Sequence, residues 1–209
     1  MNPLYEFITK PFNPNNTNDN NVLMDNMLRT MEFEGGHREK AYLDSEGYPT
    51  IGVGKLLERT KYDVLPEKYK DLEWSEEEGM STFLEDYLNM QQDVASRYGE
   101  DEFSGLPLEA QSILTDLAFN VGPSKLFTSF PGFLEDIKGG RYDEAAKELR
   151  YKNPDEGNLE ESKWWGQVGG RSTEEKIASG EWAEEESRTA NRATATFDIL
   201  TSLMGAQNQ

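Results

Sequence analysis

The spacing of apolar side chains predicts that the first regular element of the chain is a helix. Several apolar residues recur at intervals of three and four, which places them on one helical face that packs on the core. These residues are Met24, Met27, Leu28 and Met31. Polar residues at 19–21 can cap the start of this helix, and Gly35-Gly36 supplies its end.

After residue 40 the pattern shortens to that of strands. Residues 41–43 and 50–54 are predicted strands, joined by a turn at 45–47. The glycines at 47, 52 and 54 indicate a small and tightly bent sheet.

The second half of the chain shows mostly helical spacing. Ser75 and Glu78 form a capping box, which opens a helix that continues to about residue 96. Pro107 lies near the first turn of the next helix, where Ile113, Leu114, Leu117, Ala118 and Val121 face inward. Further helices are predicted over 127–138, 142–149 and 189–203, whereas 153–186 is polar and glycine-rich and supports no definite element.

These elements predict an α+β fold with one domain at 22–204. A small antiparallel sheet lobe occupies about 35–74, a larger helical lobe occupies about 75–204, and a substrate cleft is expected between them. Residues 1–21 form a polar tail, and residues 205–209 form a short C-terminal tail.

Composition narrows the chemistry that such a domain can perform. The 209 residues include no cysteine and one histidine, His37, which argues against thiolate catalysis, a His-based zinc site and a Ser-His-Asp triad. If the protein is an enzyme, its forty Asp and Glu residues leave carboxylate acid–base catalysis as the default chemistry. The net charge of −19 argues against nucleic-acid binding, and no apolar run is long enough for membrane insertion.

One pair of carboxylates is placed for glycoside hydrolysis, which needs a carboxylic acid and a second carboxylate. Glu34 ends the first predicted helix, where the negative end of the helix dipole disfavours another negative charge and so suits an acid. Asp44 follows a predicted strand in a more polar setting, and Thr50 begins the next strand with a hydroxyl that can help to hold a water.

The same residues resemble the active-site segment of the phage lysozyme (endolysin) family typified by the T-even phages. The family pattern is Glu-Gly, a short basic stretch, Tyr-x-Asp, x-x-Gly and Thr-Ile-Gly-x-Gly. In this chain the pattern corresponds to Glu34-Gly35, Tyr42-Leu43-Asp44, Gly47 and the segment 50–54. Weaker resemblances lie at 117–122 and 141–146.

The resemblance implies a lysozyme, a glycoside hydrolase that degrades peptidoglycan without a cofactor. Glu34 would be the general acid, Asp44 the carboxylate that activates water, and Thr50 its helper. The bond cleaved would join N-acetylmuramic acid to N-acetylglucosamine, generally with inversion.

The chain departs from the family pattern in three places. The interval from Glu34 to Asp44 is one residue longer than usual, so Glu32 is a weak rival for the acid. Lys55 replaces the histidine that commonly follows Gly-x-Gly, and a salt bridge to an acidic partner could replace the usual pairing. His37 is expected to be a surface residue near the cleft without a catalytic role.

The substrate-binding residues are less certain than the carboxylates. The late Trp and Gln-rich segment of the family, which ends in an arginine near the cleft, has two candidates here: one ends at Arg171 and the other contains Arg192. Arg171 is preferred together with Trp164, because aromatic rings pack on sugar faces, although Trp164 and Trp165 fit core packing equally well. Asp116 is a further candidate for a polar substrate contact.

The resemblance also implies where such a protein acts. A phage-encoded enzyme made in the host cytoplasm would act on peptidoglycan in the periplasm or cell wall, or would be carried on a virion or tail assembly; a monomer is expected. The net charge of −19 fits poorly with an anionic envelope as the target. Two alternatives therefore stay open: a non-catalytic lysozyme-fold module of a virion, and a glycosidase acting on chitin.

Overall fold

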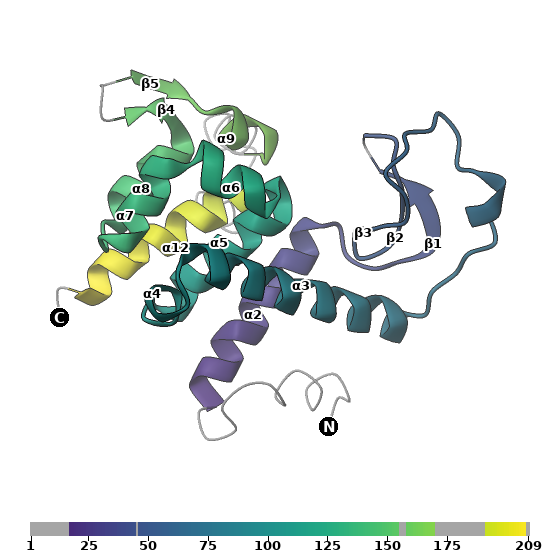
Figure 1. Ribbon diagram of the computed structural model, residues 1–209, viewed down its shortest axis with the longest axis horizontal. Helices are drawn as coiled ribbons and strands as arrows, with labels where there is room; N and C mark the ends of the chain where they lie inside the picture. Colours follow the sequence, from purple (N-terminus) through teal and green to yellow (C-terminus); the bar gives the residue numbers. More distant parts are fainter. Residues whose placement is uncertain (1–16, 45, 155–157, 170–190, 208–209) are drawn as a thin grey trace, which may run out of the picture. The chain divides into compact units, whose positions relative to one another are not determined.

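The computed structural model describes residues 17–44, 46–154, 158–169 and 191–207. The chain forms two compact units that divide between Asp93 and Val94, inside one long helix. The first unit contains a helix, a small sheet and most of this long helix (Figure 1). Its elements are α2 (Thr17–Phe33), β1 (Arg38–Leu43), β2 (Pro49–Gly52), β3 (Lys55–Leu56), the 3-10 helix η1 (Glu67–Tyr69) and α3 (Glu76–Tyr98).

Helix α2 begins at Thr17, so the predicted capping position at 19–21 is wrong and residues 17–21 belong to this helix. Residues 1–16 lie outside the described residues. The predicted apolar face is only partly buried, since Met27 is in the core while Leu28 is 37% exposed. Asn26 and Thr30 are buried beside Met27, and the Thr30 hydroxyl donates to the backbone oxygen of Asn26 at 3.1 Å.

The sheet is antiparallel with the order β1-β2-β3, which confirms the predicted hairpin. In its register Tyr42 lies opposite Thr50, and Ile51 lies opposite Lys55. All residues of this central strand β2 are buried, so both of its faces are covered. The backbone N–H of Trp74 donates to Glu39 at 2.8 Å, which ties the chain just before α3 back to β1.

Helix α3 opens with the predicted capping box. The backbone N–H of Glu78 donates to the Ser75 hydroxyl at 3.2 Å, and the backbone N–H of Ser75 donates to the Glu78 carboxylate at 2.8 Å. These reciprocal bonds satisfy donors that the first turn of a helix leaves without partners.

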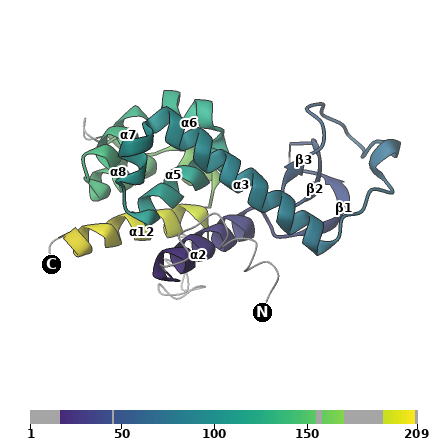
Figure 2. The same cartoon turned by 60° about the horizontal axis from the view of Figure 1, so that its bottom comes forward.

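The second unit is built around α5, whose inward face is almost fully buried. Helix α12 packs along α8 and also contacts α5 (Figure 2). The predicted inward residues of α5 are buried except Val121, which is partly exposed. The elements of this unit are α4 (Glu100–Ser104), α5 (Leu108–Val121), α6 (Pro123–Ser129), α7 (Pro131–Lys138), α8 (Tyr142–Arg150), β4 (Tyr151–Asn153), β5 (Asn158–Glu161), α9 (Lys163–Gln167) and α12 (Arg192–Gln207).

One helix prediction in this unit is wrong, and the bounds of another are shifted. The single helix expected at 127–138 is two helices, α6 and α7, because Pro131 cannot continue a helix and Phe130 before it leaves helical geometry at φ −127° and ψ 47°. The last helix begins at Arg192 and reaches Gln207, so it lies later than the predicted 189–203. The segment 153–186 contains part of the β4-β5 hairpin and α9, and its residues 170–186 lie outside the described residues.

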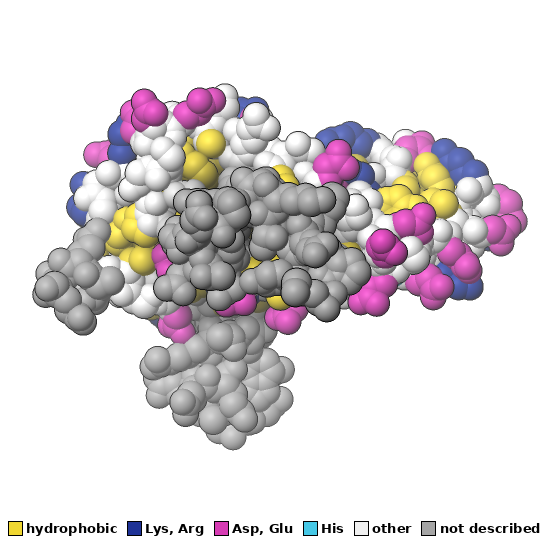
Figure 3. Space-filling model, turned by 90° about the horizontal axis from the view of Figure 1, so that it is seen from below, with side chains coloured by type: hydrophobic (Ala, Val, Ile, Leu, Met, Phe, Trp, Pro, Cys, Tyr) yellow, Lys and Arg dark blue, Asp and Glu magenta, His cyan; other side chains and the backbone are white. Residues whose placement is uncertain are grey.

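Together these elements confirm the α+β, lysozyme-like fold class: a mostly helical chain with a small antiparallel sheet. The division at Asp93 and Val94 groups α2 and most of α3 with the sheet, whereas the sequence suggested a boundary near residue 74. None of the helices in the described ranges is both long and apolar enough to cross a bilayer. Figure 3 shows Asp and Glu side chains spread over the visible surface, as the net charge of −19 leads one to expect.

Glu58 holds the loop between β3 and α3 together through hydrogen bonds of its carboxylate. These bonds make the stability of the fold depend on pH. Its carboxylate accepts bonds from Lys68 at 2.6 Å, Tyr69 at 3.0 Å and Tyr62 at 3.0 Å. The bond from Lys68, helped by those from the two tyrosines, lowers the pKa of Glu58 from 4.5 to about 2. Because the pKa of Glu58 is lower in the folded state, its carboxylate stabilises the fold at pH values above the pKa of the unfolded state. This stabilisation is lost as the pH falls through the pKa of the folded state.

We therefore expect Glu58→Gln to lower the thermal midpoint at pH 7, by an amount that shrinks as pH falls from 4.5 toward 2. Glu67→Gln is the control, because Glu67 pairs with Lys70 in the same loop through a side chain that is 87% exposed, and such pairs contribute little. A Glu58→Gln deficit that is the same at pH 7 and at pH 2 would contradict this assignment.

Candidate active site

Glu34 is the C-cap residue of α2, and a pair of left-handed glycines fixes its position. Gly35 and Gly36 have φ values of 89° and 71°. The N–H of Gly36 donates to Met31 at 3.1 Å, and the N–H of Gly35 donates to Glu32 at 3.0 Å, which is the bonding pattern of a Schellman motif. The predicted helix end at these glycines is therefore confirmed, and Glu34 lies at the negative end of the helix dipole.

The Glu34 side chain lies against the turn between β2 and β3. A Cβ atom added to Gly54 would come within 3.2 Å of Glu34 Oε2, and Gly54 has a φ of 70°. A larger residue at 54 would be strained and would crowd the carboxylate. Glycine at position 54 therefore leaves room for the Glu34 carboxylate in this chain.

Asp44 follows β1 and is held by the backbone of the hairpin turn. Its Oδ1 atom accepts bonds from the N–H groups of Glu46 at 2.9 Å and Tyr48 at 2.8 Å. Among the described residues, no hydrogen bond to Oδ2 is formed. One oxygen thus orients the carboxylate, while the other remains available to a water molecule.

Thr50 is joined to Asp44 through the backbone of Tyr48. The Thr50 hydroxyl donates to the Tyr48 carbonyl at 3.1 Å, while the Tyr48 N–H donates to Asp44. Thr50 is 3% exposed, so its hydroxyl has one fixed direction. The hydroxyl oxygen can still accept a hydrogen bond.

Tyr42 links the two carboxylates electrostatically, a role that the sequence did not reveal. Burial raises the pKa of Tyr42, the nearby Arg38 opposes this, and the negative charges of Glu34 and Asp44 raise it further. Both carboxylates therefore act on the same phenol. The position of Tyr42 in the Tyr-x-Asp pattern was the available signal, but the pattern alone does not specify this role.

The turn that carries Gly54 is anchored to α3 by the residue that follows it. Lys55 Nζ donates to both carboxylate oxygens of Asp86 at 2.8 Å each. The expected salt bridge of Lys55 to an acidic partner is thus confirmed. Both side chains are about one third exposed, so we assign the pair mainly an orienting role.

His37 packs on α3 and is more enclosed than the surface position expected from the sequence. A Cβ atom on Gly79 would lie 2.2 Å from His37 Cδ2 and 2.6 Å from Nε2. His37 Nε2 is buried and has no hydrogen-bond partner in the described part of the chain. The interval between Glu34 and Asp44, which is one residue longer than usual, therefore contains a side chain that packs against α3.

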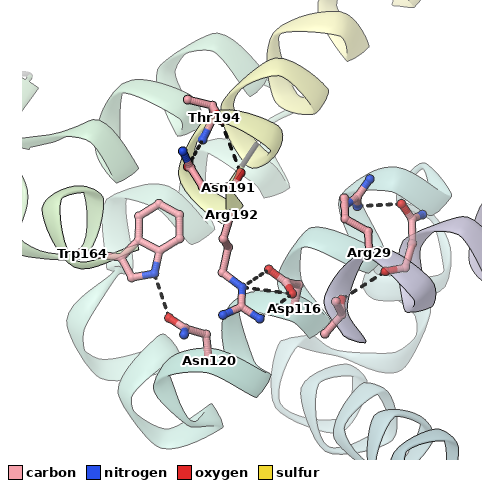
Figure 4. A network of polar contacts seen from close by, with 9 residues as sticks. Arg29, Asp116, Asn120, Trp164, Asn191, Arg192 and Thr194 are labelled. Atoms are coloured by element: carbon pink, nitrogen blue, oxygen red, sulfur yellow. Dashed lines mark hydrogen bonds and ion pairs between the residues drawn. The ribbon is translucent and has the colours of Figure 1, made fainter. Parts of the chain in front are cut away.

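The remaining candidates belong to the second unit. Asp116 on α5 is buried and forms a salt bridge with Arg192 of α12 at 3.0 Å (Figure 4). Trp164 is 5% exposed and its indole N–H donates to Asn120 at 3.1 Å. These contacts match the core-packing alternative for Trp164 and give Asp116 a structural partner. Arg171 lies outside the described residues.

The candidate acid Glu34 has a clear advantage over its rival. Glu32 is exposed on α2, whereas Glu34 is partly enclosed beside Gly54. The described ranges contain no group of three or more His, Cys, Asp or Glu residues arranged to hold a metal ion. What the site offers is two carboxylates and a hydroxyl, which suits proton transfer and activation of water.

We predict opposite effects of Gly79→Ala in two backgrounds. In the wild type the new methyl group collides with His37, so we expect a loss of about 1–3 kcal/mol of stability. In a His37→Ala background the same change should stabilise the protein by about 0.5–1 kcal/mol, because alanine favours helix over glycine. Denaturant unfolding of the four proteins tests this, and equal effects in both backgrounds would disprove the contact.

The sequence model of the phage lysozyme family matches residues 31–174. The chain is 28% identical over 179 residues to the pre-baseplate central spike protein Gp5 of Enterobacteria phage T4. This match covers 78% of the present chain but 29% of the spike protein, so the chain spans less than a third of that relative.

Proposed function

The chain belongs to the phage lysozyme family, and on that premise we propose that it is a muramidase that hydrolyses the glycan strands of bacterial peptidoglycan. The bond cleaved joins N-acetylmuramic acid to N-acetylglucosamine. The observation that carries the proposal is the placement of Glu34, Asp44 and Thr50 around the same small sheet: the Tyr48 peptide holds the latter two, and the Glu34 carboxylate lies against Gly54, at the end of the segment that begins with Thr50.

Each group has a separate task in this reaction. Glu34 protonates the leaving glycosidic oxygen from its position at the end of α2. Asp44 receives a proton from the attacking water through Oδ2, while its Oδ1 stays fixed by two N–H donors. Thr50 accepts a hydrogen bond from the same water. Attack by water opposite the leaving group gives net inversion.

The relationship to a spike protein supports a place on the phage particle. The relative is named as a central spike protein of the pre-baseplate. We propose that the present protein is likewise carried on a virion and opens the cell wall locally during entry. This function would tolerate a net charge of −19, because the particle and not electrostatic attraction would bring the enzyme to its substrate.

Release of new reducing ends from purified peptidoglycan tests the activity. We expect Glu34→Gln and Asp44→Asn each to lose about 10²–10⁴-fold in kcat, because each removes one proton-transfer group. Glu32→Gln is the matched control and should retain wild-type activity, because Glu32 is exposed on α2.

Two results would contradict the proposal. Loss of activity in Glu32→Gln but not in Glu34→Gln would transfer the acid role to the rival. A folded wild-type protein with no activity on peptidoglycan would favour the non-catalytic virion module.

A further inference from the structure

Arg38 is an exposed cation at the start of β1 that lies over the ring of Tyr42. Its guanidinium carbon is 4.1 Å from the ring centroid. In a regular strand, residues four apart are separated by about 13 Å. The register shift between Arg38 and Tyr42, together with the long arginine side chain, makes this contact possible.

Arg38 also differs from the lysines of its unit in having no acidic partner. Within the described residues of the first unit every lysine forms an ion pair with a carboxylate, whereas none is formed by Arg38. The paired lysines are Lys40, Lys55, Lys61, Lys68 and Lys70. Arg59, another exposed arginine of this unit, likewise forms no ion pair within the described residues, so what distinguishes Arg38 is its place over the Tyr42 ring.

Arg38 lies over Tyr42, which is opposite Thr50 in the register of β1 and β2 and two residues before Asp44. Its charge acts on the Tyr42 hydroxyl, and so do the charges of Glu34 and Asp44. The guanidinium group of Arg38 lies over the Tyr42 ring. The N–H groups along the edge of such a stacked guanidinium point away from the ring and can donate to a planar anion.

We propose that Arg38 binds a carboxylate of the substrate strand beside the cleavage site and thereby selects carboxylate-bearing glycans over neutral polymers of N-acetylglucosamine. This inference rests on the proposed muramidase function. A guanidinium group matches a carboxylate through paired N–H donors, which a lysine cannot reproduce. In peptidoglycan the carboxylate can belong to the stem peptide or, in strands without peptides, to the lactyl group of the muramic acid.

The test compares cleavage of three forms of the same purified strands: with stem peptides, stripped of stem peptides, and with all carboxylates converted to amides. The proteins are the wild type, Arg38→Gln, Arg38→Lys and Arg59→Gln. Arg59 is the matched control, because it is an exposed arginine of the same unit and its change removes the same charge. The quantity compared is the ratio of kcat/KM on carboxylate-bearing strands to kcat/KM on amidated strands.

We expect Arg38→Gln to lower this ratio about tenfold, mainly through KM, because a charge-assisted hydrogen bond to substrate is lost. Arg38→Lys should retain part of the preference, and Arg59→Gln should retain all of it. A loss confined to strands with stem peptides assigns the carboxylate to the peptide; a loss on stripped strands assigns it to the lactyl group.

An unchanged ratio in Arg38→Gln, or an equal loss in Arg59→Gln, would overturn the inference while the muramidase function stands. A folded wild type that cleaves none of the strands would overturn both proposals, and the two failures are thus distinguishable.

Discussion

The left-handed end of α2 is the constraint on which the rest of the candidate site depends. Gly35 and Gly36 close the helix with two backbone bonds and turn the chain directly into β1. Glu34 is therefore fixed as the C-cap residue of α2, and its carboxylate lies against Gly54. A residue with a Cβ atom pays a conformational penalty of about 1–2 kcal/mol in this geometry. The position of the candidate acid thus follows from backbone stereochemistry.

The second carboxylate is placed by a different device, the tight hairpin between β1 and β2. The backbone of Tyr48 connects Asp44 to Thr50, so the two groups that would handle water share one rigid peptide. Gly52 has no Cβ atom, so the sheet can pack closely against Trp74, which precedes α3, and against Gly79 near the start of α3. The Lys55–Asp86 pair fixes the following turn to the same helix. Each of these contacts lies within the first unit, so its geometry is determined by local packing.

The sequence predicted the parts of this site that depend on local rules and missed those that depend on tertiary contacts. The helix end at Gly35-Gly36, the hairpin and the Ser75–Glu78 capping box follow from residue type and short spacing, and all are observed. The start of α2 at Thr17 could not be read in the same way, because asparagine-rich sequence serves both caps and loops. The packing of His37 on Gly79 and the stacking of Arg38 on Tyr42 join residues whose proximity has no sequence pattern. For Trp164 the sequence allowed a core position or a sugar-facing one, and burial beside Asn120 agrees with the first.

The most direct measurement of the central claim compares Gly35→Ala with Gly35→Asn, since no atom lies within 4 Å of a Cβ at this position and only the φ of 89° opposes substitution. Asparagine tolerates a left-handed conformation far better than alanine does. If the left-handed cap positions the candidate acid, Gly35→Ala should lose about 1–2 kcal/mol of stability and most of its kcat on peptidoglycan, whereas Gly35→Asn should retain most of both. Wild-type stability and kcat in Gly35→Ala would contradict the account.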